Sequence, residues 1–322
     1  MSLERATLRQ LRALAATIRS GSVTAAAQQL NVTPPAVSLQ LKLLEELAGV
    51  ALLERAEAGM RATGAGRELA DTALRIDALL SEAEDTIQAL RGGHAGHIHV
   101  GVVSTAKYFA PRVLAAFRRA HPGIEIQLSV GNREETIAAL ETFAIDFAVM
   151  GRPPSRFEVD RSIIGPHPHI IVAPPDHPLV RRRYIAPREL SSETFLMREP
   201  GSGTRTLTEQ LLAETGATPR VGMEIASNET IKQAVMAGLG IALLSAHTVS
   251  VELTDGRLAM LDVVGLPIMR QWFVVRRSER RMMPAAGMLW DFFAAEGGKF
   301  LPELTTDESP LSIAVSDPGG YR

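Results

Sequence analysis

The hydrophobic period of the chain changes near residue 92. Before this point apolar residues recur every three or four positions, and beyond the segment "RGGHAG" (91–96) short apolar strands alternate with amphipathic helices. The first pattern is typical of packed helices and the second of a sheet covered by helices. We therefore expect an all-α N-terminal domain and a C-terminal α/β domain, with 91–96 as the hinge between them.

Three helices are predicted at the start of the chain. The first carries Leu8, Leu11, Ala15 and Ile18 at helical spacing and ends at Gly21. The second covers 24–30, with Ser22 or Thr24 as its cap. The third covers 33–49, with Thr33 as cap, Pro34 in its first turn and Gly49 at its end. With a two-stranded wing over 51–63, this order predicts a winged helix-turn-helix.

The third helix has a polar outward face. If Val37 lies at the buried centre, then Leu41, Leu44 and Ala48 share its face, and Pro35, Leu39, Lys42 and Glu46 lie opposite with Ser38 to one side. Lys42 and Ser38 suit a phosphate or a guanine edge, and Leu39 a thymine methyl group. The alternative is an ordinary solvated helix face. The predicted DNA-binding residues are Ser22, Thr24, Thr33, Pro34, Pro35, Ser38, Leu39, Lys42, Arg55 and Arg61.

Charge supports this interpretation, although the whole chain has a net charge of only −2. Residues 1–67 hold eight Lys and Arg against five acids, a net charge of +3, whereas residues 68–91 hold two arginines against six acids, a net charge of −4. The basic charge therefore accompanies the predicted DNA reader.

A long helix is predicted from Thr63 to about Arg91. Its apolar residues alternate spacings of four and three, as in a two-helix coiled coil: Leu69, Ala73, Ile76, Leu80, Ala83, Ile87 and Leu90. We favour self-association through this seam over packing against the helix's own domain, because the positions between are polar and acidic.

The remaining pattern predicts two α/β lobes. Lobe I comprises residues 96–165 and 272–297, and lobe II residues 166–271, so that the last helix returns to lobe I. The full division is a DNA-binding domain over 1–63, a linker helix over 64–92, an effector domain over 93–297 and a disordered tail over 298–322.

Four segments at predicted helix starts suit an anion in the cleft between the lobes: "STAK" (104–107), "GNRE" (131–134), "GSGTR" (201–205) and "SNET" (227–230). Helix N-termini offer free N–H groups, glycines admit a close approach, and arginines hold phosphate or carboxylate. The alternative is a capped glycine turn with solvated arginines. The predicted effector-binding residues are Ser104, Thr105, Lys107, Asn132, Arg133, Arg152, Arg198, Gly201, Ser202, Gly203, Thr204, Arg205 and Asn228.

Other chemistries lack support. The glycine loop is not followed by the Gly-Lys-Ser/Thr of a nucleotide-hydrolysing site, and no nucleophile elbow occurs. His167, His169 and His177 lack a carboxylate cluster, so we expect no metal site. Zero cysteines, no signal-peptide pattern and no long apolar run fit a cytoplasmic protein without a membrane span.

Residues 21–55, followed by "MRATGAG" and a long helix, resemble the winged helix-turn-helix of LysR-type transcriptional regulators, and the resemblance continues through "AFRRAHPGIEIQL", "IDFAVMG" and "AGLGIALL". It implies two periplasmic-binding-protein-like lobes and a homodimer or homotetramer. Pro34 stands where the family often has glutamine, and Leu39 where it often has a basic residue. "STAKYFAP", "GNREE", "MGRPP" and "REPGSGTR" most resemble the CbbR-type regulators of Calvin-cycle genes.

The function expected is therefore a non-enzymatic, sequence-specific regulator of promoter DNA, with RNA polymerase as a candidate partner. The subgroup implies a phosphorylated sugar or acid, or NADPH, as effector, and no obligatory cofactor. The alternatives are a LysR-type regulator of another metabolic operon, a cytoplasmic solute-binding protein, and an enzyme acting on a phosphorylated metabolite, for which the sequence offers no acid–base pair.

Overall fold

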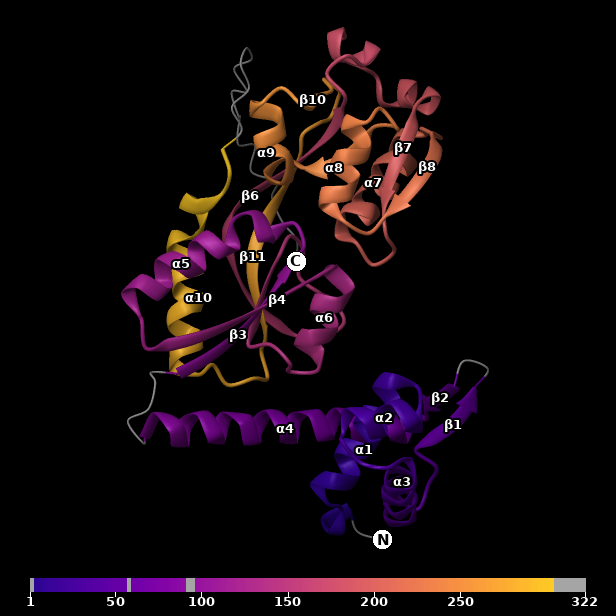
Figure 1. The fold of residues 1–322 in the computed structure, drawn as a ribbon, viewed down its shortest axis with the longest axis vertical. Coiled ribbons are helices and arrows are strands. Elements are labelled where there is room, and N and C mark those ends of the chain that lie inside the picture. Colours follow the sequence, from indigo (N-terminus) through magenta and orange to yellow (C-terminus); the bar gives the residue numbers. More distant parts are fainter. Residues whose placement is uncertain (1–2, 57–58, 91–95, 304–322) are drawn as a thin grey trace.

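The computed structural model describes residues 3–56, 59–90 and 96–303. A helical N-terminal part precedes an α/β part made of two lobes (Figure 1). The first part contains a short 3-10 helix (Leu3–Arg5), α1 (Leu8–Ser20), α2 (Val23–Gln29), α3 (Pro34–Ala48), strands β1 (Leu53–Ala56) and β2 (Gly59–Ala62), and α4 (Gly64–Leu90). The hinge residues 91–95 lie outside the described residues.

The predicted helix ends are confirmed, and their caps are corrected in part. Gly21 and Gly49 end α1 and α3 in the left-handed conformation, at φ 65° and 70°. Ser22 and Thr33 occupy the N-cap positions of α2 and α3, but neither side chain makes a capping hydrogen bond. Thr24 lies inside α2, so it is not the cap.

The wing is fixed to the helices. Strands β1 and β2 are antiparallel, and the Met60 N–H donates to the Gly21 carbonyl at 2.8 Å. On α3, the Glu45 carboxylate accepts from the Leu52 N–H at 2.8 Å. A Cβ atom on Gly66 would stand 1.9 Å from the Leu52 carbonyl oxygen, so only glycine permits α4 to start this close to the wing.

The apolar seam of α4 has two different environments. Its first half packs on the N-terminal core, where Ala73 is 2% exposed and Leu69 and Ile76 are partly buried. Further along, Leu80 is 38% and Ile87 49% exposed. The alternative that the helix packs on its own domain thus holds for its first half. The helix also reaches the effector part, where Arg75 pairs with Glu279 at 3.2 Å, and Leu80 and Ile87 stay partly exposed.

Lobe I contains most of a seven-stranded sheet. Its strand order is β10 (Ala259–Met260), β6 (Val159–Ala173), β11 (Ile268–Arg277), β5 (Phe147–Met150), β3 (Gly96–Val103) and β4 (Ile124–Gly131), and β9 (Ala242–Ser245) pairs with β6. Strand β3 pairs in parallel with β4 and β5, and β11 runs antiparallel to β5 and β6. The elements of lobe I are β3 (Gly96–Val103), α5 (Ala110–Ala120), β4 (Ile124–Gly131), α6 (Arg133–Glu141), β5 (Phe147–Met150) and α10 (Pro284–Glu296).

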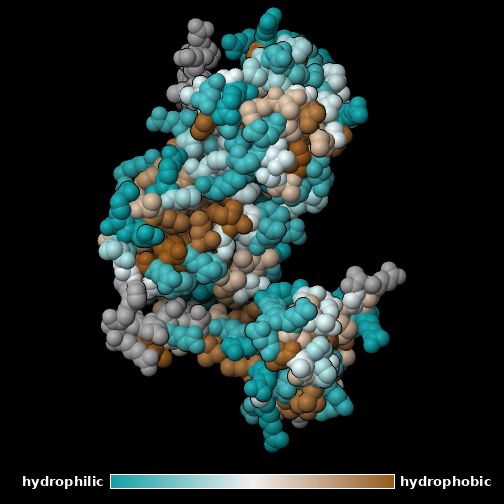
Figure 2. Space-filling model, in the orientation of Figure 1, coloured by the Kyte–Doolittle hydropathy of each residue, from teal (hydrophilic) through white to brown (hydrophobic). Residues whose placement is uncertain are grey.

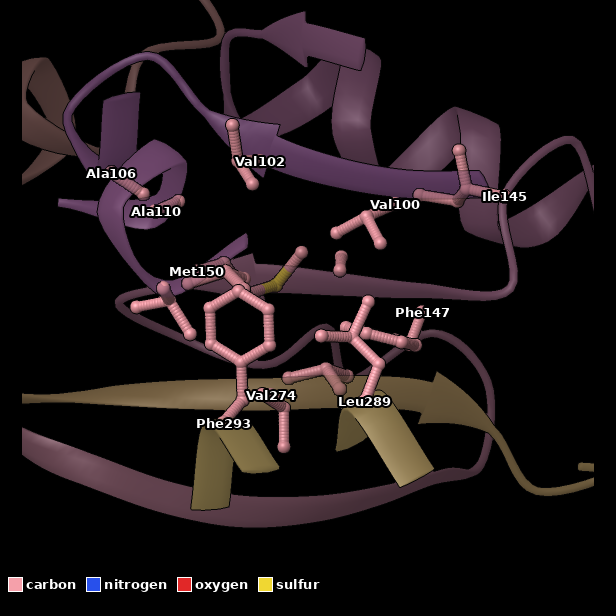
Figure 3. Close-up of a cluster of buried hydrophobic side chains, with 14 of the residues drawn as sticks. Val100, Val102, Ala106, Ala110, Ile145, Phe147, Met150, Val274, Leu289 and Phe293 are labelled. Atoms are coloured by element: carbon pink, nitrogen blue, oxygen red, sulfur yellow. The ribbon is translucent and has the colours of Figure 1, made fainter. Parts of the chain in front are cut away.

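The core of lobe I lies between this sheet and its helices. Leu289 and Phe293 of α10 pack against Val100, Phe147 and Val274 of the strands (Figure 3), and all five are fully buried. The last helix, α10, therefore packs on the core of lobe I. Trp272 is fully buried in the same cluster.

Lobe II carries two further cores on either side of its strands. The elements that cross into it or complete it are β6 (Val159–Ala173), β7 (Thr194–Arg198), α7 (Gly203–Thr215), β8 (Arg220–Ile225), α8 (Asn228–Met236), β9 (Ala242–Ser245), α9 (Ala246–Thr254), β10 (Ala259–Met260) and β11 (Ile268–Arg277), with 3-10 helices at Pro178–Arg181 and Pro187–Ser192. Strands β6 and β11 join the two lobes, so the effector cleft would open beside them.

The expected tail begins later than residue 298. A 3-10 helix, Gly297–Phe300, follows α10, and Phe300 and Leu301 pack on the core of lobe I. The Phe300 carbonyl also accepts from Arg112 at 2.7 Å. These apolar contacts order residues 298–303, and the rest of the predicted tail lies outside the described residues.

The surface is mostly polar. Among the apolar regions in view, one lies over lobe I, where brown atoms gather near α5 and α10 (Figure 2). Among the helices described, none is both long enough and apolar enough to cross a bilayer.

Candidate functional site: an arginine-lined cavity and a DNA-reading helix

A cavity of about 290 Å³ lies between the lobes. Nine of the predicted effector residues line it: Ser104, Thr105, Asn132, Arg133, Arg152, Arg198, Ser202, Gly203 and Thr204. They come from the end of β3, the start of α6, the end of β5, the end of β7 and the start of α7. Three of the four predicted segments thus contribute to one cavity, whereas "SNET" (227–230) contributes no lining residue.

The start of α7 presents unsatisfied donors to this cavity. The first N–H groups of a helix have no intrahelical acceptor, and the N-cap Ser202 makes no side-chain capping bond. A Cβ atom on Gly203 would lie 3.3 Å from Arg133 Cδ, so the arginine of lobe I reaches this helix start. An anion there would meet backbone donors, hydroxyls and a cation.

Arg198 lines the cavity, but its charge is already matched. It is 2% exposed, and its Nε and Nη2 donate to the Glu199 carboxylate at 2.7 and 2.9 Å. Its remaining donors bond Asn228 Oδ1, the Ala226 carbonyl at 3.3 Å and Ser104 Oγ at 3.4 Å. The guanidinium therefore holds the two lobes and the loop in place rather than offering a free charge.

Four predicted effector residues do not line the cavity. Arg205 faces outward, where it pairs with Glu209 at 2.8 Å and Glu224 at 2.5 Å. The ammonium group of Lys107 lies 5.2 Å from the ring centre of Tyr108. Asn228 is buried behind the lining and orients Arg198 and Ser104. Gly201 sits beside the cavity at φ 82° and accepts from the Glu134 N–H at 3.2 Å.

Three arginines line the cavity without an ion pair among the described residues. They are Arg133, Arg152 and Arg270, and no Asp or Glu lines the cavity with them. Burial, and after it the neighbouring Arg152, lowers the pKa of both Arg133 and Arg270. Mutual repulsion of this kind is relieved by a bound anion.

Two buried histidines complete the lining. Burial lowers the pKa of His169 to about 3 and that of His167 well below its usual value, so both rings are neutral near pH 7. His167 bonds Ser245 Oγ at 3.0 Å and stacks on Trp272 at 3.7 Å between ring centres. No cluster of His, Asp or Glu able to hold a metal occurs in the described part of the chain.

The lobes also touch beside the cavity. Arg198 and Asn228 of lobe II reach Ser104 of lobe I, and the Tyr108 hydroxyl donates to Glu229 at the start of α8. Burial is the first cause of the raised pKa of Tyr108, and this hydrogen bond is the second. A ligand that bridges the lobes would therefore act on contacts that already join them.

The outward face predicted for α3 is exposed. Val37, Leu41 and Leu44 are buried, whereas Thr33, Pro34, Pro35, Ser38, Leu39 and Lys42 are exposed. Lys42 lies 3.9 Å from Glu46, with 75% of its side chain exposed, so it remains available to a phosphate. On the wing, Arg55 is exposed and Arg61 lies 3.5 Å from Glu54.

Family models match both parts of the chain. Residues 8–67 match the bacterial regulatory helix-turn-helix protein of the lysR family, and residues 91–298 match the LysR substrate binding domain. The chain belongs to the LysR family. This LysR-family chain is accordingly a DNA-binding transcriptional regulator that carries an effector-binding domain, and it is not an enzyme.

Individual relatives extend over most of the LysR-family chain. The regulator CbbR of Xanthobacter flavus is 53% identical over 304 residues, covering 94% of this chain and 91% of the relative. The RuBisCO operon transcriptional regulator of Allochromatium vinosum is 42% identical, covering 91% and 97%. The CcmR regulatory domain of Synechocystis PCC6803, solved with 2-PG, superposes with a TM-score of 0.60 at 34% identity, covering 62% and 96%.

Several lining residues were not predicted as effector residues: Val103, Gly151, Ser155, His167, His169, Thr206, Leu207, Gln210 and Arg270. Among these residues, Arg270 adds a positive charge to the cavity. It lies two residues before the buried Trp272 on β11, and that strand crosses between the lobes. A cation inside a strand that leads to buried aromatic residues is the signal that would have identified it.

Proposed function

We propose that this LysR-type regulator controls carbon-fixation genes and senses a small phosphorylated acid in the cavity between its lobes. The gene class is supported by the relatives named for CbbR and for the RuBisCO operon. The ligand class is supported by the 2-PG complex of the CcmR domain. The observation that most strongly supports an anionic ligand is the lining of the cavity, which contains four arginines and no carboxylate.

The nine lining residues of the predicted set are the proposed effector contacts, together with Arg270. Ser104, Ser202 and the start of α7 suit phosphate oxygens, and the unpaired arginines supply charge. A phosphorylated sugar or NADPH uses the same donors and is the next class to test.

DNA recognition is assigned to α3 and the wing. Ser38, Leu39 and Lys42 lie together on the exposed face of a helix whose other face is buried, which suits insertion into the major groove. Pro34 and Pro35, exposed in its first turn, and Arg55 and Arg61 on the wing complete the assigned surface, with Ser22, Thr24 and Thr33 near the phosphate backbone. The wing would contact the phosphate backbone of the DNA beside that groove.

Self-association is assigned to the second half of α4. Exposed Leu80 and Ile87 continue the heptad seam beyond the N-terminal core, and a second copy of α4 would cover them as a coiled coil. The apolar region of lobe I (Figure 2) offers a second contact, which would make a tetramer. We divide the chain accordingly into a reader over 1–63, a linker over 64–92 and an effector domain over 93–297 of periplasmic-binding-protein type.

Regulation follows if the effector prefers one arrangement of the lobes. Tight binding alone would shift no equilibrium, so the ligand must contact both lobes in one state. Ser104 and Arg133 of lobe I and Ser202 of lobe II allow this. The change would reach promoter DNA through α4, with RNA polymerase as a further partner and the cytoplasm as the site of action.

Calorimetry with the full chain tests this assignment. 2-Phosphoglycolate, sugar phosphates and NADPH are titrated beside unphosphorylated dicarboxylates and aromatic acids. A phosphorylated compound should bind in the micromolar range, about −8 kcal/mol. Preference for an aromatic acid or an unphosphorylated carboxylate would overturn the ligand class.

A further inference from the structure

The linker helix α4 touches the effector domain directly. Arg75 Nη2 lies 3.2 Å from Glu279 Oε2. Glu279 stands in the loop between β11 and α10, and Figure 1 shows this loop at the edge of lobe I that lies over α4. The covalent connection between the two parts of the chain runs through residues 91–95, so this ion pair is a further connection between them, made across space.

Arg75 moves together with the DNA reader. Its neighbours Ala73 and Ile76 pack in the N-terminal core, which also contains the buried face of α3. Two residues further along α4, Asp77 accepts from Arg12 Nε of α1 at 2.8 Å. Because a close-packed core shifts as a unit, a displacement of Arg75 carries the reader helix α3 with it.

Glu279 is held in position by the effector domain. Its Oε2 atom also accepts from Arg277 Nη2 at 2.8 Å. The Arg277 guanidinium in turn donates to the Glu141 carbonyl at 2.8 Å and lies 4.5 Å from the ring centre of Phe143. The carboxylate is therefore oriented before Arg75 meets it, which lowers the entropy cost of forming the ion pair.

The strand that ends at this contact also enters the cavity between the lobes. Arg270 on β11 lines the cavity, and Trp272 on the same strand is fully buried and stacks on His167 of β6. Strand β11 is paired with β6 on one side and with β5 on the other, and it ends at Arg277, two residues before Glu279. A rearrangement of the lobes around a ligand would therefore displace the position of Glu279.

Resting on the proposed function, we infer that Arg75 and Glu279 are positioning residues through which the effector domain sets the place of the DNA reader. The ion pair is made in one arrangement of the two parts and opened in the other, so it biases the same equilibrium as the effector. By linkage, the pair influences both effector affinity and operator affinity, although it touches neither ligand. An exposed ion pair changes such an equilibrium by at most about fivefold.

Glu158 provides a matched control. It is exposed, and its carbonyl accepts from the Ser278 N–H at 3.3 Å, so it borders the same loop. Its carboxylate forms no ion pair within the described ranges, whereas that of Glu279 binds Arg75. Glu158→Gln thus removes the same charge beside the same loop without releasing α4.

The test uses the full chain, calorimetry with 2-phosphoglycolate, and fluorescence anisotropy with DNA from upstream of a carbon-fixation operon. Arg75→Gln should change the affinity for 2-phosphoglycolate and the affinity for DNA without ligand, each by about threefold to fivefold. Adding Glu279→Gln to it should change neither affinity by more than a further factor of about 1.5, because the pair is already lost. Glu158→Gln should match wild type.

The outcomes separate this inference from the proposed function. Wild-type affinities for ligand and DNA in Arg75→Gln overturn the inference and leave the effector site in place. Effects of the two substitutions that multiply also overturn it, because the residues then act independently. A changed mass of Arg75→Gln in light scattering assigns Arg75 to subunit assembly instead.

The DNA measurement decides the inference even without a ligand. If wild type binds no phosphorylated compound, the proposed function fails. An unchanged operator affinity in Arg75→Gln then overturns the contact as well, and a changed affinity that Glu279→Gln does not enlarge supports it.

Discussion

Arg198 of lobe II donates to Ser104 Oγ of lobe I across the wall of the cavity, at 3.4 Å, although 94 residues separate them in the chain. The same guanidinium is held by Glu199 and Asn228. The loop "REPGSGTR" therefore combines a structural arginine with a free helix start. The anion is left to the helix start and to arginines from elsewhere in the fold.

Replacing Arg198 should mainly destabilise the effector domain. Arg198→Ala leaves the partly buried carboxylate of Glu199 without its partner, which costs about 2–4 kcal/mol. Arg205→Ala removes ion pairs with the exposed Glu209 and Glu224, and should cost less than about 1 kcal/mol. Urea denaturation measures both, and equal losses would contradict the different roles assigned to the two arginines.

Gly201→Ala should weaken effector binding. Gly201 is left-handed at φ 82°, and its Cβ atom would lie 2.7 Å from the movable Glu134 Oε2 and 3.1 Å from Glu134 Cβ, so the start of α6 in lobe I must shift slightly away. Gly216→Ala is the matched control, because Gly216 is left-handed at φ 65° with open space around it. In both variants the left-handed conformation of alanine should lower the free energy of unfolding by about 1 kcal/mol. Only Gly201→Ala should also lose ligand affinity in a calorimetric titration. Equal losses of ligand affinity in the two variants would show that the contact between Gly201 and Glu134 does not support binding.

Lys42→Ala should weaken operator binding at least about tenfold. It should also reduce, by about one per subunit, the slope of the logarithm of the binding constant against the logarithm of the salt concentration. The side chain is exposed on α3, so the fold should persist, as circular dichroism can show. Arg9→Ala, an exposed cation on α1, serves as the control. An undiminished footprint from Lys42→Ala would exclude this face as the reader.

Charges on the exposed part of α4 should separate subunits. Leu80→Glu with Ile87→Glu places acids on the apolar seam and should shift the mass measured by light scattering toward the monomer. Asp71→Lys, on an exposed position of α4 outside the seam, should leave the mass unchanged. An unaltered assembly in the double variant would exclude α4 as the subunit contact.

The buried histidines should make stability fall in mild acid. The pKa of His247 is lowered to about 4 and that of His169 to about 3, from an ordinary 6.5, because burial disfavours the charged ring. The unfolded chain then binds more protons, so stability is complete above pH 6.5 and is lost as pH falls toward these values, by about 1.4 kcal/mol per pH unit for each histidine. Thermal melts of wild type between pH 7 and 5 should show this fall, and His247→Gln should show less of it. A fall of the same size in His247→Gln would contradict this assignment.

Local signals explain what the sequence could predict. Gly21, Gly49 and Pro34 mark helix ends by their own conformational limits, so the helix-turn-helix followed from short segments. The cleft followed because polar and glycine residues stand at helix starts. The roles of Arg198 and Arg205 could not be separated, because both flank one loop and only distant partners, Asn228 and Glu224, determine their directions. Arg270 enters from a crossing strand far along the chain.

The central claim is that one ligand in the cavity changes how the chain holds DNA. Fluorescence anisotropy with DNA from upstream of a carbon-fixation operon measures this directly, with and without saturating 2-phosphoglycolate. We expect the ligand to change operator affinity or footprint length in wild type. The same change should require more ligand in Arg270→Gln, whose affinity for DNA without ligand should be retained. Identical binding curves and footprints with and without a phosphorylated ligand that calorimetry shows to be bound would contradict it.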